Sequence, residues 1–230
     1  MADGRVPRSP SLQPRSNALL VAALAALANG AALLANIVIG FPLPILLAFT
    51  WAVAVVSVLA VTSTGDHAAR RSLGRIIGLG AVAGIVATLV YDATKFGLSQ
   101  LDPSPFNPFE VTRIFGTLLI GGSASPAAIQ VAGWAFHLAN GITFGIAFAC
   151  LYARLGRDSL RIGIVGGVCW GLFLETFQLV LYPGWLNIRY LAEFRQISFL
   201  AHVVFGLILG TIVPRGLRVL RAPARSLVTD

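Results

Sequence analysis

The stretch HLANGITFG at residues 137–145 reads as a histidine, three residues, a glycine, three residues and a second glycine. The same spacing returns in HVVFGLILG at residues 202–210, shifted by 65 positions. Residues four apart lie on one face of an α-helix, and small residues on such a face let transmembrane helices approach closely. The pattern therefore predicts two closely packed helices, each of which carries a histidine on the same face as its two glycines.

The composition places these helices in a membrane. Mean hydropathy is +0.82, 57% of the 230 residues are hydrophobic and only 11% are charged. A water-soluble domain with this composition would expose large apolar patches. A helix needs roughly 20 apolar residues to cross a hydrocarbon core of about 30 Å. Six stretches meet that length and predict an all-α, polytopic bundle of six transmembrane helices: about 18–39, 43–61, 76–98, 127–153, 162–182 and 197–213.

The basic residues predict the orientation, because short cytoplasmic loops collect Lys and Arg. Four of the 17 fall on one side of the six spans, namely Lys95, Arg113, Arg189 and Arg195, and the other thirteen fall on the opposite side. We therefore expect a bacterial inner-membrane protein with both termini in the cytoplasm. The net charge of +8 is then explained by loops that face an anionic lipid leaflet. It does not indicate binding to nucleic acid. The expected partner is the lipid bilayer, and a homo-oligomer or a membrane partner is left open.

The segments outside the spans are polar or rich in proline. Residues 1–16 are predicted to be a disordered cytoplasmic N-terminus, 17–214 a six-span domain, and 215–230 a cytoplasmic tail. The external loop at 99–126 is expected either to lie at the membrane interface or to re-enter the membrane. The first apolar run resembles a secretory signal but continues to Ile39, which is longer than such signals usually are. We expect it to be retained.

The glycine and histidine pattern belongs to a larger repeat. The span at 76–98 carries Gly80, Gly84 and Asp92, and a shift of 83 places these on Gly163, Gly167 and Glu175 of the span at 162–182. The two histidine stretches match at a shift of 65. Because the matched spans run in the same direction, we predict that spans 3–4 and 5–6 are parallel two-helix repeats, as found in some transporter folds.

Four ionisable residues are predicted to share one layer within the membrane. They lie 13 to 17 residues from the nearest cytoplasmic arginine, which corresponds to roughly 20–25 Å at the helical rise. Ionisable side chains at such depth usually face a bundle interior or a polar path. The candidate site residues are Asp92, His137, Glu175 and His202, supported by Lys95, Asn140 and Gln178.

Simpler roles are open for three of these residues. Asp92 has Lys95 three positions on and could form a peripheral ion pair with it. The two histidines could be core residues bonded to a carbonyl or to Asn140. Glu175 has no basic residue three or four positions away, so it is the strongest candidate for a functional residue among the four.

Two kinds of chemistry suit this residue set. Histidines and carboxylates can exchange protons. Imidazole and carboxylate are also ligands for transition metal ions, and His137, His202 and Glu175 are the predicted ligands. The leading hypothesis is the handling of protons or small ions. The alternatives are a membrane-embedded metal-dependent enzyme and a non-catalytic assembly subunit. No catalytic motif for a phosphate loop, a serine triad or a zinc protease is present, which argues against an enzyme.

Four stretches also resemble the YagU-like group of small bacterial inner-membrane proteins, over about residues 76–213. They are GAVAGIVATLVYDATKFG at 80–97, HLANGITFGIAFACLYARLG at 137–156, GIVGGVCWGLFLETFQLVLYPGW at 163–185 and FLAHVVFGLILG at 199–210. The resemblance implies an inner-membrane location and a link to acid resistance, without a biochemical mechanism. The chain departs from the expected pattern by carrying Glu175 where a histidine is more typical.

Overall fold

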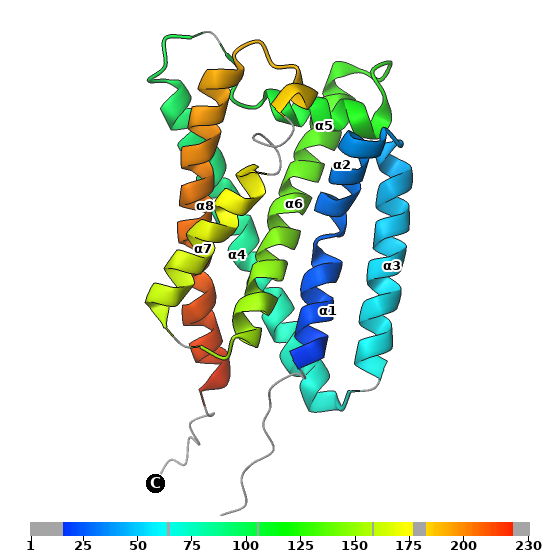
Figure 1. Cartoon of the computed structure of the whole chain (residues 1–230), viewed down its shortest axis with the longest axis vertical. Coiled ribbons are helices and arrows are strands. Elements are labelled where there is room, and N and C mark those ends of the chain that lie inside the picture. Colours follow the sequence, from blue (N-terminus) through cyan, green and yellow to red (C-terminus); the bar gives the residue numbers. More distant parts are fainter. Residues whose placement is uncertain (1–15, 64, 105, 158, 177–182, 223–230) are drawn as a thin grey trace, which may run out of the picture.

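The computed structural model describes residues 16–63, 65–104, 106–157, 159–176 and 183–222. All regular structure in these residues is helical, which confirms the predicted all-α class (Figure 1). The elements are α1 (Ser16–Ala26), α2 (Ala28–Ile39), α3 (Leu43–Ser63), α4 (His67–Ser99), α5 (Glu110–Ile120), α6 (Pro126–Arg154), α7 (Leu160–Glu175), the 3₁₀ turn η2 (Pro183–Leu186) and α8 (Leu191–Arg221).

Four helices of the described chain are long and apolar enough to cross a membrane. They are α3, α4, α6 and α8, with 21, 33, 29 and 31 residues. Helices α1 and α2 together make a fifth candidate, because they meet at Leu27 with a bend of 46°. The predicted span at 18–39 is therefore a broken helix.

The predicted span at 162–182 is described only in part. Helix α7 has 16 residues, which is about 24 Å at the helical rise and shorter than the hydrocarbon core. Residues 177–182 lie outside the described residues. The structure thus supports four to five spans, and the count of six stays a prediction.

Side-chain caps set the starts of three of these helices. Asp66 accepts a hydrogen bond from Ala69 N before α4, and Ser125 accepts one from Ala128 N before α6. Ser159 does the same for Ile162 N before α7. Each cap satisfies one backbone N–H group that has no partner inside the helix.

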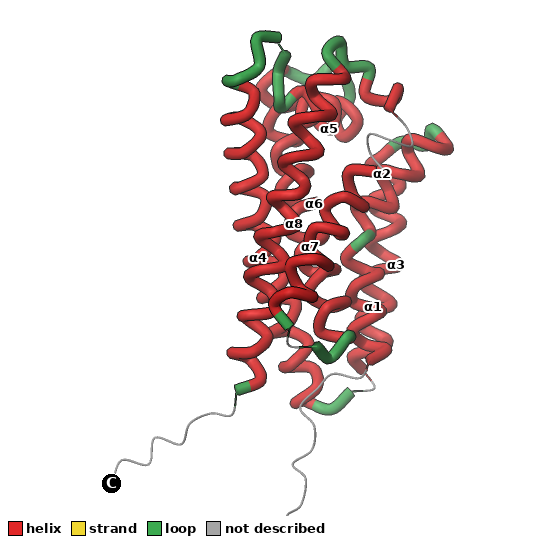
Figure 2. Tube along the Cα trace, turned by 60° about the vertical axis from the view of Figure 1, so that its left-hand side comes forward, coloured by secondary structure: helices red, strands yellow, loops and turns green. Residues whose placement is uncertain are grey.

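The bundle has two distinct ends. Helix α1 begins and α8 ends at one end, where the connections from α3 to α4 and from α6 to α7 also lie (Figures 1 and 2). The turn from α2 to α3, helix α5 and η2 lie at the opposite end. Helix α5, within the loop predicted at 99–126, packs on α6, where Phe115 meets Phe136 at 5.2 Å between ring centroids. We call these the terminal end and the loop end.

Helix α3 shows how the outer surface is built. Only two of its residues, Leu43 and Ala54, are buried. The side chains of Phe49, Val56 and Leu59 are all more than 60% exposed. A row of exposed apolar side chains along a 21-residue helix is the surface expected against lipid, so a membrane environment fits the fold.

Glycines bring the central helices together backbone to backbone. A Cβ atom on Gly84 of α4 would collide with the Gly141 carbonyl oxygen of α6. A Cβ atom on Gly167 of α7 would collide in the same way with the Gly206 carbonyl of α8. Gly80 against Gly145, and Gly163 against Gly210, repeat this relation one turn further toward the terminal end. The glycine pattern seen in the sequence therefore forms the contact faces of the helix pairs α4–α6 and α7–α8.

Candidate functional site

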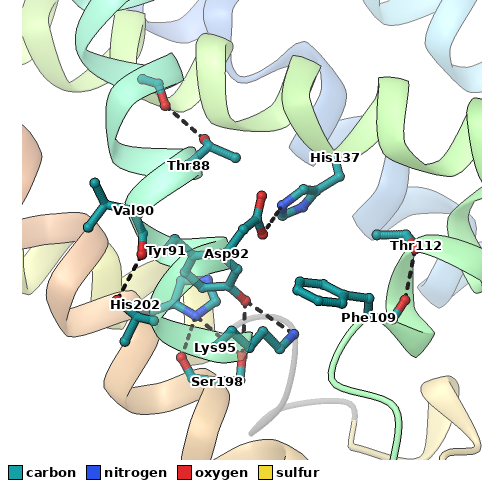
Figure 3. A network of polar contacts seen from close by, with 12 residues as sticks. Thr88, Val90, Tyr91, Asp92, Lys95, Phe109, Thr112, His137, Ser198 and His202 are labelled. Atoms are coloured by element: carbon teal, nitrogen blue, oxygen red, sulfur yellow. Dashed lines mark hydrogen bonds and ion pairs between the residues drawn. The ribbon is translucent and has the colours of Figure 1, made fainter. Parts of the chain in front are cut away.

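The first ionisable pair joins α4 to α6. His137 Nε2 lies 2.8 Å from Asp92 Oδ1, and the two side chains are 15% and 17% exposed (Figure 3). The glycine contacts of Gly84 with Gly141 hold the two helices close enough for this bond. Among the described residues, Asp92 is thus paired with a histidine of the neighbouring helix.

The second pair joins α7 to α8 and is more deeply buried. His202 Nδ1 lies 2.7 Å from Glu175 Oε2, and the side chains are 11% and 5% exposed. His202 Nδ1 also lies 2.9 Å from the carbonyl oxygen of Ser198. A carbonyl oxygen can only accept, so Nδ1 carries a proton and donates it. The Ser198 hydroxyl donates to the same Glu175 oxygen at 3.0 Å.

Tyr91 of α4 links the two pairs. Its ring lies 4.8 Å from the His202 ring and 5.9 Å from the His137 ring, measured between centroids. Its hydroxyl is 3.4 Å from the Ser198 hydroxyl oxygen. The four predicted residues therefore surround one buried tyrosine, which is 6% exposed.

Lys95 does not form the predicted ion pair with Asp92. In the described part of the chain no carboxylate lies within 4 Å of its ammonium group. The side chain is 1% exposed, and Nζ lies 4.0 Å from the centre of the Phe194 ring and 3.4 Å from the Tyr91 hydroxyl. The reason is packing: α4 turns Asp92 toward His137 of α6 (Figure 3) and Lys95 toward Phe194 of α8. An aromatic face and a hydroxyl stabilise the ammonium there.

The hydrogen bonds around Tyr91 have one direction. Lys95 has donors only, so it donates to the Tyr91 hydroxyl. Since Ser198 uses its proton for Glu175, the Tyr91 hydroxyl donates to Ser198. The donors therefore run from Lys95 through Tyr91 and Ser198 to Glu175, and His202 Nδ1 lies 2.7 Å from Glu175 Oε2 on the other side. All of them end on one buried carboxylate.

A cavity of about 50 Å³ lies between these helices, beside both histidines. This is enough for a few water-sized molecules. The predicted supporting residue Asn140 lies on its wall and is 4% exposed, and its Oδ1 atom has no hydrogen-bond partner among the described residues. The lining residues are Thr88, Tyr91, His137, Asn140, His202 and five apolar side chains, together with Gly141.

The predicted metal ligands are divided between the two pairs. His202 and Glu175 bond to each other, whereas His137 bonds to Asp92. Within the described ranges, no three His, Cys, Asp or Glu side chains are grouped so that they could hold a metal ion. The metal site stays a prediction, which metal analysis of the purified protein would test.

The sequence reading missed Tyr91 and Ser198. Signals for both were present: Tyr91 lies four residues before Lys95, and Ser198 lies four residues before His202, so each pair shares a helix face. The third predicted supporting residue, Gln178, lies outside the described residues.

Comparison with known proteins gives a family but no activity. No curated protein and no solved structure matches the chain. A relationship to the YagU-like group is not confirmed. Residues 74–218, which include most of both helix pairs and all four ionisable residues of the layer, match a family of unknown function. The chain belongs to this family, DUF6789.

Proposed function

We propose that this protein is an integral membrane protein that handles protons or small ions at the layer formed by Asp92, His137, Glu175 and His202. The observation that carries the proposal is the directed chain of donors that ends on Glu175. Ionisable groups within a membrane bundle are costly and typically mark ion or proton pathways. A chain of hydrogen bonds between an ammonium and a carboxylate is a route along which protons can move.

His202 supplies the exchange step in this proposal. Its Nδ1–H group donates to the Ser198 carbonyl and lies close to Glu175 Oε2, so a neutral ring has a free lone pair on Nε2. A proton that arrives at Nε2 allows the Nδ1 proton to pass to the carboxylate, because imidazole can hold a proton on either nitrogen. Asp92 and His137 form a second pair of the same kind across the cavity.

Two helix interfaces next to the site are closed toward the terminal end. Below the layer, the helix pairs meet through Gly80 and Gly145 and through Gly163 and Gly210, with backbone against backbone. Such contacts leave no room for a polar path along these two interfaces. We therefore propose that the layer exchanges protons with the loop end.

The same contacts support a duplicated architecture. A shift of 83 positions relates Gly84 and Asp92 of α4 to Gly167 and Glu175 of α7. A shift of 65 positions relates His137 and Gly141 of α6 to His202 and Gly206 of α8. We propose six spans, with spans 3–4 and 5–6 as parallel repeats, in a bacterial inner membrane with both termini in the cytoplasm.

Topology is the first prediction. Reporter fusions after Asp102 and Gly184 should read as external, and fusions after Arg71, Gly156 and the C-terminus as cytoplasmic, because the arginines gather at the terminal end. Paired reporters that are active only on one side of the membrane measure this directly. A cytoplasmic signal from the fusion after Asp102 would exclude the six-span arrangement.

Proton flux tests the function itself. In proteoliposomes containing a pH-sensitive dye, Tyr91→Phe should lower proton flux by about tenfold or more, because it removes the hydroxyl that connects Lys95 to Ser198 and keeps the ring. Glu175→Gln should do the same by removing the terminal acceptor of the proton. The matched control is Tyr152→Phe, which removes another buried hydroxyl, bonded to Ser159 O near the terminal end.

The control variant should conduct as the parent does. If the parent shows no flux above empty liposomes, the proposal is wrong and a structural role for the layer gains support. If Tyr91→Phe and Tyr152→Phe reduce flux equally, the donor chain is not the route.

A further inference from the structure

We propose that the cavity beside His137 and His202 binds ammonium or a small primary alkylammonium cation. The inference rests on the proposed function, because it takes the same layer as the working site, and it names the class of ion. The argument comes from the hydrogen-bonding character, the charge and the size of the cavity.

The cavity wall presents acceptors. Asn140 Oδ1 is buried and has no partner within the described residues, and a buried oxygen of this kind calls for a donor. The Thr88 hydroxyl donates to the Gly84 carbonyl at 2.8 Å, so its lone pairs remain for the cavity. His202 donates through Nδ1, which leaves Nε2 of the neutral ring as an acceptor.

His137 fits the same scheme. Its Nε2 atom lies on the Asp92 carboxylate, which accepts the proton, so Nδ1 of the neutral ring carries a lone pair. These four groups favour a ligand that donates several hydrogen bonds. Ammonium and primary alkylammonium ions have N–H donors and no acceptor.

The charges around the cavity favour a single positive ion. Each lining histidine is paired with a carboxylate, Asp92 or Glu175. Among the described residues, Lys95 is the one lysine beside them, so acidic side chains outnumber lysines in the layer. The rings of Tyr91, Phe115, Phe144 and Phe205 also line the cavity, and an aromatic face attracts a cation more than it attracts a neutral water molecule.

Size separates ammonium from other cations. The volume of about 50 Å³ admits water-sized groups, and ammonium is close to water in size, whereas a tetramethylammonium ion is larger and has no N–H group. Sodium and potassium ions require a shell of several oxygen ligands. This wall offers few oxygens, and two of its four acceptors are imidazole nitrogens.

Binding of radiolabelled methylammonium to the full-length chain in detergent, measured by equilibrium dialysis at pH 7, tests the inference. We expect saturable binding that ammonium displaces, and that equal concentrations of sodium, potassium or tetramethylammonium ions do not displace. Asn140→Leu should weaken binding by about tenfold or more, and Thr88→Val should weaken it less. The control Asn29→Leu removes another buried asparagine, which is bonded to Trp51 away from the cavity, and should leave binding unchanged.

Absence of saturable binding to the folded parent would overturn the inference, as would equal displacement by sodium or potassium. Because the competition series uses the parent, it decides the question even if Asn140→Leu fails to fold. The two proposals fail separately. Proton flux without methylammonium binding would reject only this inference, and binding without flux would reject only the proton route.

Discussion

Replacing Glu175 with leucine is expected to lower the free energy of unfolding by about 1–3 kcal/mol, the usual cost of leaving a buried hydrogen-bond donor without its acceptor. Glu175 is 3% exposed, accepts a hydrogen bond from Ser198 and lies 2.7 Å from His202 Nδ1. Leucine keeps an apolar volume but accepts no hydrogen bond. The Ser198 hydroxyl would lose its acceptor in a buried setting, and His202 would lose the carboxylate beside its ring.

Glu175→Gln is the matched variant. Its amide oxygen can accept from Ser198 as the carboxylate does, so we expect it to fold nearly as well as the parent. Thermal unfolding in detergent should therefore rank Glu175→Leu far below Glu175→Gln. Repeating the measurement with metal present and with chelator tests the metal hypothesis, since a glutamine would weaken a site in which the carboxylate is a ligand. Equal unfolding of both variants and the parent would show that Glu175 does not contribute to a buried pair.

Gly84→Ala is expected to destabilise the protein by about 1–3 kcal/mol, because the added methyl group overpacks a tight contact. A Cβ atom at this position would collide with the Gly141 carbonyl oxygen and lie 3.0 Å from Ile142 Cα. These are backbone atoms of α6, so no side chain can move aside. The helices would have to separate, and the bond between Asp92 and His137 one to two turns away would lengthen.

Gly78→Ala is the control on the same helix. A Cβ atom there meets nothing within 4 Å, and alanine is the better helix former by about 1 kcal/mol. We expect this variant to be as stable as the parent or slightly more stable. Gly167→Ala should resemble Gly84→Ala, because its Cβ atom would collide with the Gly206 carbonyl. A harmless Gly167→Ala would contradict the proposed repeat.

The sequence predicted the helical class and the close helix pairs from local features. Apolar length predicts a membrane helix because an unpaired backbone group is costly in lipid. Glycines four apart predict a contact face because they lie on one side of the helix. Both inferences concern a single helix and its register, and the observed contacts of Gly84 with Gly141 and of Gly167 with Gly206 follow from them.

Continuity of the spans was harder to predict. The run at 18–39 is apolar throughout, yet the helix breaks at Leu27 with a bend of 46°. No proline or polar residue lies at the break, and Asn29 follows it by two positions, bonded to Trp51 of α3. Hydropathy records only the summed apolar character of a window, so it is insensitive to such a bend.

The partners within the layer were decided by the tertiary structure. From the sequence spacing, Asp92 could pair with a lysine on its own helix. In the structure the rotation of α4 instead places Asp92 against His137, and Lys95 against Phe194 and Tyr91. Depth along a helix can be estimated from the sequence by counting residues. Which neighbour a side chain meets depends on how helices rotate and pack against one another. That is why the sequence by itself determined the four ionisable residues and their common depth, and only the tertiary structure decided their pairing, the central place of Tyr91 and the cavity beside Asn140.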